Sequence, residues 1–386
     1  MTTPLRIGLV SLTFSPGFVT PFPGVNRYAV SLAETLATNG CQVRVVTPRL
    51  GRAPPHESWR GIEIVRLRDS KSLFGKLGVV GQLNVRTFEL NLLRHPALFQ
   101  NSDVVQTDLP LLRIRRSWPG IPLISMVHHV YRPWNGIDVL TVPFGVMYQR
   151  AALKRADAVV APSTSAAADI AGVYRVPTGK IRVIHHGVNA SLFHPPTSAR
   201  QRPSQEDPSL LYVGLLESRK GVDDLIPIFS RVHKEIPASK LTIVGNGPME
   251  TELRRLCWDL GLGSHVVFRS KLDDQELAST IGKCGVFLLP SRLEGFGLVA
   301  AEAMACARPL VAYDSATNRE VIGDAGILVA KGDISAFSDA IVKLVRRPDL
   351  SIRLGERGRQ RVMSRFDWNA SARQYIDLYK RLLTNY

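Results

Sequence analysis

Residues 290–305 read Pro-Ser-Arg-Leu-Glu-Gly-Phe-Gly-Leu-Val-Ala-Ala-Glu-Ala-Met-Ala, and they follow a short apolar run at 285–289. The apolar run predicts a buried strand, the glycine-flanked segment predicts a turn, and a helix is expected to begin near Gly297. Glu302 is the one polar side chain of that helix. A carboxylate among apolar side chains is costly to bury without hydrogen-bond donors, and the hydroxyls of a sugar or ribose are such donors.

A second carboxylate, Glu294, lies on the loop that leads into the same helix. The backbone N–H groups at a helix N-terminus bind anions and oxygen atoms. Two carboxylates and a glycine loop therefore indicate a site for a ligand with many hydroxyl groups and one negative group. The alternative is a helix cap together with one hydrogen-bonded buried glutamate.

Short apolar runs and longer amphipathic stretches alternate on both sides of this segment. The runs are almost continuously apolar, which is typical of strands buried in parallel sheets. A polar, Pro- and Ser-rich segment at 195–208 predicts a link between two α/β domains of similar size. Strands are expected before it at 6–12, 42–47, 62–67, 103–106, 122–127, 157–161 and 182–184. After it, strands are expected at 209–214, 240–245, 265–268, 285–289, 309–313 and 326–329, and a last helix at 369–383.

The composition restricts the class of protein. The chain has 386 residues, of which 45% are hydrophobic and 21% charged, and these values fit two folded domains and exclude a disordered chain. The net charge is +16, and residues 1–190, with 22 basic and 10 acidic residues, carry +12 of it. Such an excess suggests an anionic partner: nucleic acid, an acidic membrane face or a phosphorylated small molecule.

The sequence predicts neither a membrane span nor a disulfide framework. No run reaches the ~18 apolar residues of a spanning helix, and residues 1–14 do not have the pattern of a signal peptide. The four cysteines are widely spaced and form no C-x-x-C pair, so a zinc site is not expected. We therefore expect a reduced, cytoplasmic protein.

The spacing Glu294-x7-Glu302, inside Pro-Ser-x-x-Glu-Gly-Phe-Gly, resembles the retaining glycosyltransferases of family 4, which include many mannosyl- and glucosyltransferases. The resemblance covers nearly the whole chain. It implies an α/β protein with the GT-B fold, in which two facing Rossmann-like, doubly wound domains form an interdomain cleft. Residues 1–190 would be the acceptor-side domain and 191–366 the nucleotide-sugar-binding domain, with a helix at about 367–386 packed back on the first.

The same resemblance implies roles for the residues of the decisive stretch. Glu302 would bind the ribose hydroxyls of the sugar nucleotide, and Glu294 would lie beside the donor sugar as a catalytic residue. The backbone amides of Gly295, Phe296 and Gly297 would contact the donor sugar or its phosphates.

A basic pair follows the first strand of the second domain. By resemblance, Lys220 binds the diphosphate, and a lysine is suited to neutralise a leaving nucleotide. The family often has arginine where this chain has Leu215, so Arg219 is the candidate for the second phosphate-binding cation. Without the resemblance, a basic pair after a strand is more typical of a solvated loop.

Glycines at strand ends complete the implied donor site. Gly214 and the turn of Gly245 and Gly247 match the family's donor-binding turns. In the first domain, the family usually has Gly-Gly where this chain has Pro23-Gly24. Gly24 keeps the conformational freedom of glycine, whereas Pro23 lacks an N–H donor.

Two further candidates lie outside these segments. His128 ends an apolar strand, and the resemblance places it near the donor sugar as a catalytic residue, with His129 as the less favoured register. Glu320 is a weak candidate because the Gly-Gly that often precedes this glutamate is absent. The pairs Asp223-Asp224 and Asp273-Asp274 are not D-x-D metal motifs, and we interpret them as helix caps.

The expected function is transfer of a mannose- or glucose-type hexose from a nucleotide-diphosphate sugar to an acceptor hydroxyl, with retention of anomeric configuration. No metal or other cofactor is expected to be obligatory, with Mg²⁺ at most stimulatory. The acceptor is expected to be a glycan or a lipid-linked molecule at the inner membrane face. A soluble small molecule or secondary metabolite is the alternative, and a basic nucleic-acid-binding protein is a distant one because no such motif is found.

Two stretches suggest a peripheral position on an anionic membrane surface. Residues 71–81 mix basic and bulky apolar side chains, and Arg113, Arg115 and Arg116 lie close to Trp118 in the sequence. Such mixtures bind anionic bilayers. An amphipathic segment packed on its own domain would have the same composition.

Overall fold

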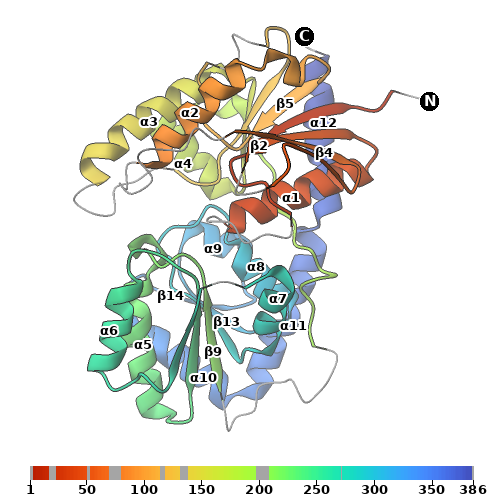
Figure 1. Cartoon of the computed structure of the whole chain (residues 1–386). Coiled ribbons are helices and arrows are strands. Elements are labelled where there is room, and N and C mark those ends of the chain that lie inside the picture. Colours follow the sequence, from red (N-terminus) through yellow and green to blue (C-terminus); the bar gives the residue numbers. More distant parts are fainter. Residues whose placement is uncertain are drawn as a thin grey trace. The chain divides into compact units, whose positions relative to one another are not determined.

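The computed structural model describes residues 3–16, 23–49, 53–68, 80–113, 118–130, 138–196, 208–270 and 272–384. The chain divides into two compact units (Figure 1). Among the described residues, unit 1 consists of those up to His186 and those from Trp368 onward, and unit 2 consists of Gly187–Asp367. The boundaries predicted from the sequence were 190/191 and 366/367.

Unit 1 contains an eight-stranded sheet in the order β3-β4-β2-β1-β5-β6-β7-β8. Its strands are β1 (Arg6–Val10), β2 (Gln42–Pro48), β3 (His56–Trp59), β4 (Ile62–Leu67), β5 (Val104–Thr107), β6 (Leu123–Met126), β7 (Ala158–Ala161) and β8 (Ile181–Val183). Neighbouring strands are parallel except for β3, which pairs antiparallel with β4 at the sheet edge. The predictions missed β3 because its side chains alternate between exposed and half-buried and give no apolar run.

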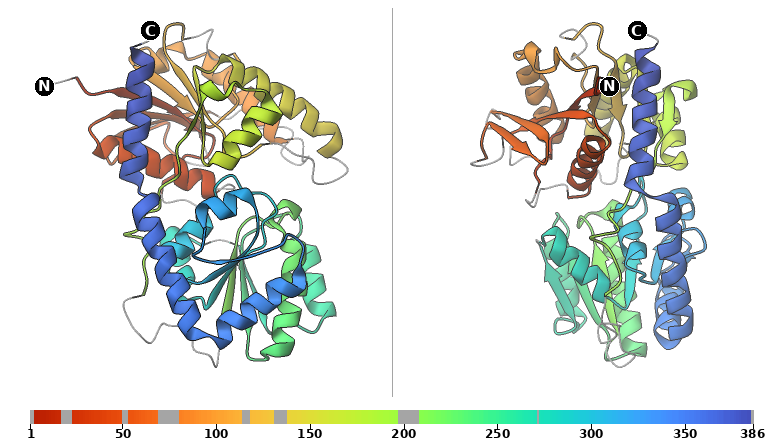
Figure 2. Two further views of the ribbon diagram at one scale, coloured as in Figure 1. Left: turned by 180° about the vertical axis from the view of Figure 1, so that it is seen from behind. Right: turned by 90° about the vertical axis from the view of Figure 1, so that its right-hand side faces the viewer.

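Helices cover both faces of this sheet. The helices α1 (Pro23–Thr38) and α12 (Trp368–Leu383) lie side by side on one face (Figure 1 and Figure 2). The other face packs against α2 (Val80–Leu93), α3 (Asp138–Arg155) and α4 (Thr164–Tyr174). A short 3₁₀ helix at Pro96–Phe99 and another at Thr178–Lys180 complete the unit.

Unit 2 contains a six-stranded, all-parallel sheet in the order β11-β10-β9-β12-β13-β14. Its strands are β9 (Ser209–Val213), β10 (Lys240–Val244), β11 (Val266–Arg269), β12 (Val286–Leu289), β13 (Leu310–Tyr313) and β14 (Ile327–Val329). All six were predicted, within one or two residues at each end. Its helices are α5 (Val222–Glu235), α6 (Glu250–Asp259), α7 (Asp274–Lys283), α8 (Leu298–Ala305), α9 (Ala316–Val321), α10 (Ile334–Arg346) and α11 (Pro348–Arg365), with a 3₁₀ turn at Ser218–Lys220.

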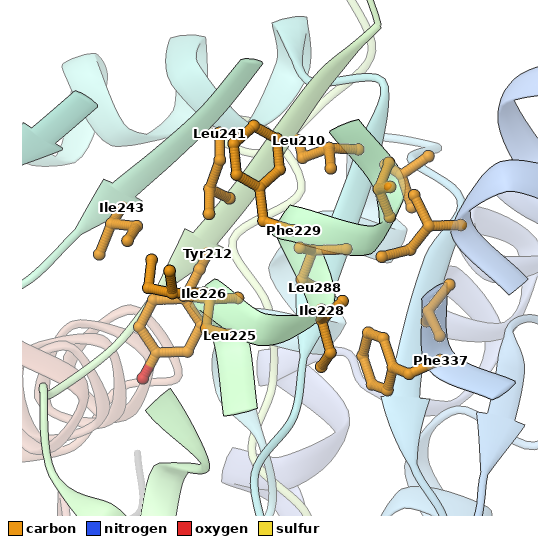
Figure 3. Packing of buried hydrophobic residues seen from close by; sticks show 14 of the residues in the cluster. Leu210, Tyr212, Leu225, Ile226, Ile228, Phe229, Leu241, Ile243, Leu288 and Phe337 are labelled. Atoms are coloured by element: carbon orange, nitrogen blue, oxygen red, sulfur yellow. The ribbon is translucent and has the colours of Figure 1, made fainter. Parts of the chain in front are cut away.

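The core of unit 2 explains why its strands are apolar on both sides. Leu210 and Leu241 project from β9 and β10 toward Phe229 of α5, and Phe337 of α10 belongs to the same cluster (Figure 3). The opposite face of the sheet packs against α7, α8 and α11. Each fully buried side chain of this kind contributes about 1.5–3 kcal/mol. The apolar faces therefore fix the register, and the carboxyl ends of the strands are left to carry polar loops.

Candidate functional site

The donor-site candidates of unit 2 gather at one edge of its sheet. The loops after β9, β10, β12 and β13 all follow the carboxyl ends of adjacent parallel strands. Ligands of open α/β sheets bind at this edge. The sequence candidates Lys220, Gly245, Glu294 and Gly297 lie on these loops.

Glu294 and Lys220 form an ion pair at this edge. Lys220 Nζ donates to Glu294 Oε1 over 2.7 Å, and the two side chains are only 16% and 8% exposed. Burial by itself would raise the pKa of Glu294, but the Lys220 ammonium, and after it Arg219, hold that pKa below its ordinary value. Glu294 is therefore ionised at neutral pH, and an anionic ligand that binds Lys220 must compete with it.

The loop that carries Lys220 is fixed to the loop that carries Glu294. The amides of Arg292 and Leu293 donate to the carbonyl of Arg219 over 3.0 and 3.3 Å. Gly221 has a φ of +65°, and a Cβ there would lie 1.9 Å from the carbonyl oxygen of Pro290. Only glycine permits both this conformation and this approach. Arg219 itself pairs with Glu217 over 2.5 Å.

Asp223 and Asp224 are not helix caps, contrary to the prediction. They lie in the first turn of α5, whose N-cap is Gly221. Arg292 donates to both carboxylates, over 2.8 Å to Asp223 and 2.7 Å to Asp224. The two carboxylates thereby hold Arg292 in place, and Arg292 lies on the loop that leads to Glu294. Asp273, by contrast, caps α7 with a capping box, as predicted.

The glycine turn after β10 packs backbone against backbone. Gly245 has a φ of +153°, and a Cβ there would lie 1.8 Å from the carbonyl oxygen of Gly214. A Cβ at Gly247 would lie 2.4 Å from the carbonyl oxygen of Leu216. These contacts give the three glycines a packing role, and their contact with a donor remains a prediction.

Gly297 begins α8 as its N-cap with a φ of +84°. The first N–H groups of a helix have no partner within the helix, so this end attracts oxygen atoms and negative charge. Gly295 and Phe296 are buried beside it, and the Phe296 ring packs edge-on against Phe366 with ring centroids 5.2 Å apart. The Phe296 side chain is therefore part of the core.

Glu302 lies on α8 and is 2% exposed. The prediction that a carboxylate would be buried on an apolar helix therefore agrees with the structure, and its ribose contact remains a prediction. Glu320 is half-buried on α9, and its carbonyl oxygen accepts from Arg361 over 2.8 Å.

Thr317 and Asn318 were not among the predicted site residues. The hydroxyl of Thr317 donates to the carbonyl of Glu294 over 3.0 Å, and Asn318 Nδ2 donates to the carbonyl of Tyr313 over 2.7 Å. Ser315 caps the same helix by accepting from the Asn318 amide. These bonds connect α9 to the Glu294 loop, and the Ser-x-x-Asn cap is the one sequence signal that marks them.

In unit 1, His128 follows β6 and lies against Tyr28. The two rings meet edge-on with centroids 4.8 Å apart, and His186 packs on Tyr28 at 4.6 Å. Burial lowers the pKa of His128 to about 4, so the ring is neutral at pH 7. His129 beside it is exposed.

The predicted role of Gly24 depended on a backbone conformation that glycine adopts more readily than other residues, and Gly24 does not adopt such a conformation. It lies in the first turn of α1, is exposed, and is not among the glycines with positive φ. The loop that precedes it, and residues 71–79 and 114–117 of the two basic stretches, lie outside the described residues.

Residues 23–192 match the family model described as Glycosyltransferase Family 4, and residues 183–361 match the model described as Glycosyl transferases group 1. The D-inositol 3-phosphate glycosyltransferase of Xylanimonas cellulosilytica is 27% identical over 383 residues, which cover 92% of this chain and 91% of that protein.

Two solved structures extend the comparison. Sucrose-phosphate synthase of Thermosynechococcus elongatus has a TM-score of 0.84 and 26% identity, covering 99% of this chain and 100% of its own. The Anabaena HepE protein, solved with UDP and glucose, has a TM-score of 0.74 and 18% identity, covering 98% of this chain and 100% of its own. The second likeness concerns the fold alone.

Proposed function

Since this chain belongs to glycosyltransferase family 4 and has the GT-B fold, we propose that it moves a mannose- or glucose-type hexose from a nucleoside-diphosphate sugar to an acceptor hydroxyl, with retention of anomeric configuration. The observation that carries the proposal is the largely buried ion pair of Lys220 and Glu294 beside the N-terminus of α8. It combines a cation, a carboxylate and backbone donors at one strand edge.

Each part of this edge has a task in the proposed reaction. The diphosphate takes Lys220 from Glu294, which frees the carboxylate to accept hydrogen bonds from the hydroxyls of the donor hexose. The N-terminus of α8 stabilises the charge that develops on the leaving diphosphate. Arg219 is the second candidate cation, and Glu302 is assigned to the ribose.

The proposed reaction needs no bound metal. Asp223 and Asp224 are an adjacent pair of carboxylates, as a metal site would need, but both of them pair with Arg292. Activity should therefore persist after dialysis against EDTA, and Mg²⁺ should at most stimulate it. Activity that disappears in EDTA and returns with Mg²⁺ would contradict this part.

The donor is best identified by thermal unfolding with nucleotides and nucleotide sugars. A ligand at 100 times its dissociation constant stabilises the folded state by about 2.7 kcal/mol. UDP-glucose and GDP-mannose are the first pair, each compared with its free nucleotide. NMR of the product then gives the anomeric configuration. Stabilisation by none of these nucleotides would refute the proposed donor class.

For the acceptor, we favour a glycan or lipid-linked molecule at an anionic membrane face. Unit 1 has 25 basic and 11 acidic residues, a net charge of +14, whereas unit 2 has 24 and 22, a net charge of +2. Phe144 and Met147 are 67% and 68% exposed and lie three residues apart on α3, hence on one helix face. Exposed apolar side chains on a basic unit suit an acidic bilayer surface.

Vesicle binding tests this choice. Phosphatidylserine–phosphatidylcholine vesicles should sediment the protein at low salt, and Phe144→Ser with Met147→Ser should reduce the bound fraction several-fold. Trp258→Ser is the matched control, because Trp258 is 82% exposed but belongs to unit 2. Equal vesicle binding by all variants would contradict a membrane-binding role for Phe144 and Met147. In the described residues, no helix is long and apolar enough to cross a membrane.

A soluble acceptor is the second candidate. Two similar proteins have names that refer to small phosphorylated molecules, inositol 3-phosphate and sucrose phosphate. Each of them matches more than nine-tenths of this chain. Phosphorylated polyols also suit the positive charge of unit 1. Transfer to D-inositol 3-phosphate in the absence of vesicles would favour this candidate.

A further inference from the structure

A carboxylate that the sequence did not single out lies at the carboxyl edge of the unit 1 sheet. Ser11, Asp108 and His128 follow the ends of β1, β5 and β6, which are neighbours in the sheet. The hydroxyl of Ser11 donates to Asp108 Oδ2 over 2.6 Å, and the Asp108 amide donates to the carbonyl of Val10 over 3.3 Å. Asp108 is thus fixed by both its backbone and one carboxylate oxygen.

The second oxygen of this carboxylate has no partner among the described residues. Asp108 Oδ1 is covered from solvent and makes no hydrogen bond with them, and the same is true of His128 Nε2. Thr13 Oγ1 is a third such atom, and the Thr13 amide donates to the same Ser11 hydroxyl over 3.3 Å. Buried polar atoms are nearly always hydrogen-bonded in folded proteins. They lie together at the carboxyl edge of the sheet, where open α/β sheets bind their ligands, so a ligand hydroxyl is the partner that this place favours.

An aromatic ring lies next to these atoms. Tyr28 packs against His128, and Asp108 acts electrostatically on the same tyrosine. The Tyr28 hydroxyl is already engaged, because Tyr375 lies 2.9 Å from it and Gln106 Nε2 donates to it over 2.9 Å. Tyr28 is itself buried and also packs against His186, so its part is to hold the His128 ring in place.

The charges at this edge select neutral ligand groups. Burial raises the pKa of Asp108 to about 7, and the hydrogen bond from Ser11 acts in the opposite direction. His128 is neutral at the same pH. Neither group supplies a positive charge, so a phosphate would gain nothing here. A hydroxyl, which both donates and accepts, matches a carboxyl group in either protonation state and a neutral imidazole.

We propose that Asp108 is a hydroxyl-binding residue for a sugar or cyclic polyol: its Oδ1 accepts a hydrogen bond from a ligand hydroxyl, beside His128, which the family resemblance already places near the donor sugar. The inference rests on the proposed function and names the residue of unit 1 that recognises a substrate hydroxyl. The hydroxyl belongs either to the hexose of the donor or to the acceptor, and the experiment separates the two.

Asp108→Ala and Asp108→Asn in the full chain test the site against Asp103→Asn. Asp103 precedes the same strand at its other end and pairs with Arg6 over 2.6 Å. Calorimetry gives the affinities for UDP and GDP and for UDP-glucose and GDP-mannose. Donor hydrolysis and transfer to D-inositol 3-phosphate and to phosphatidylinositol in vesicles give the rates.

The result identifies the source of the hydroxyl. If it belongs to the donor, Asp108→Ala binds the sugar nucleotide about 10- to 100-fold more weakly and the free nucleotide normally, as expected for one hydrogen bond to a charged group. If it belongs to the acceptor, donor binding and hydrolysis are unchanged and kcat/KM for transfer falls by the same factor. Asp103→Asn changes neither.

Stability separates binding from a structural role. Because Asp108→Asn keeps an oxygen for the Ser11 hydroxyl and Asp108 Oδ1 has no partner among the described residues, Asp108→Asn should unfold at a temperature no lower than that of Asp103→Asn. Variants of Asp108 that match the wild type in every binding and rate assay would overturn the proposal. The wild type and Lys220→Met separate that result from failure of the proposed function. If the function holds, the wild type binds UDP or GDP and Lys220→Met binds them more weakly, whatever Asp108 does. If the function fails, the wild type binds neither nucleotide.

Discussion

Replacing Lys220 by methionine isolates the electrostatics of the donor edge. The substitution keeps much of the side-chain length but removes the ammonium that lies 2.7 Å from Glu294 Oε1. Glu294, 8% exposed, then remains as a buried carboxylate without its first partner. Removing one member of a buried pair costs about 3–5 kcal/mol, and because Lys220 is 16% exposed we expect about 3 kcal/mol.

The loss should depend on pH. In the wild type, the lowered pKa of Glu294 stabilises the folded state above the ordinary value of 4.5, and this contribution disappears as the pH falls through the folded-state pKa. In Lys220→Met, burial dominates and the pKa lies above the ordinary value. The carboxylate then destabilises the fold as the pH rises, so the difference between the two proteins shrinks in acid.

Urea unfolding from pH 4 to 8 measures the stability, and calorimetry with UDP and GDP measures the nucleotide affinity. The affinity should fall about 10- to 100-fold, the value of one charge-assisted hydrogen bond. The double variant Lys220→Met with Glu294→Gln should recover most of the stability but none of the affinity. Arg346→Met is the control, since its pair with Glu235 is 58% and 60% exposed and contributes under about 1 kcal/mol.

Two outcomes would refute this reasoning. A double variant no more stable than Lys220→Met would mean that an unpaired Glu294 is not the cause of the loss. Unchanged UDP and GDP affinity in Lys220→Met would remove Lys220 from the diphosphate site.

Three further substitutions have definite expected results. Gly245→Ala should lower the free energy of unfolding by about 3 kcal/mol in urea, because its Cβ would lie 1.8 Å from the Gly214 carbonyl oxygen. Gly263→Ala meets no atom within 4 Å and should be neutral, so equal losses would contradict the packing role. Glu302→Gln should weaken binding of the donor nucleotide sugar at least about 10-fold by calorimetry, and wild-type affinity would remove Glu302 from the ribose site. Tyr375→Phe deletes one hydroxyl of the pair with Tyr28 and should cost about 1 kcal/mol in thermal unfolding, whereas a stability gain would mean that the pair is strained.

Most of the fold could be predicted from the sequence because buried parallel strands have an unmistakable pattern. The runs around Leu211 and Leu288 are apolar at nearly every position, since helices cover both faces of their sheet. The edge strand at His56–Trp59 has no such pattern, because solvent rather than a helix lies against half of its side chains. Its antiparallel pairing with β4 depends on the short turn between them.

The sequence supplied the candidate residues of the donor edge but not the contacts between them. Lys220 and Glu294 are 74 positions apart in the chain, and no local sequence pattern indicates that the Lys220 ammonium donates a hydrogen bond to the Glu294 carboxylate. Asp223 and Asp224 have the sequence of a helix start, and only the approach of Arg292 reveals their bracing role. Asp108 follows a strand, as many aspartates do, so its unpartnered oxygen becomes visible only in three dimensions.

The return of α12 to unit 1 has a consequence for biosynthesis. Tyr375 and Tyr379 of this helix complete the core around Tyr28 and Gln106, yet they are translated after the whole of unit 2. At a synthesis rate of about 5–20 residues per second, the 200 residues from Gly187 onward take roughly 10–40 s. During that time the chain is still attached to the ribosome, and the apolar face of unit 1 that α12 later covers stays exposed. Unit 2, encoded without interruption, is therefore the first part of this protein able to finish folding.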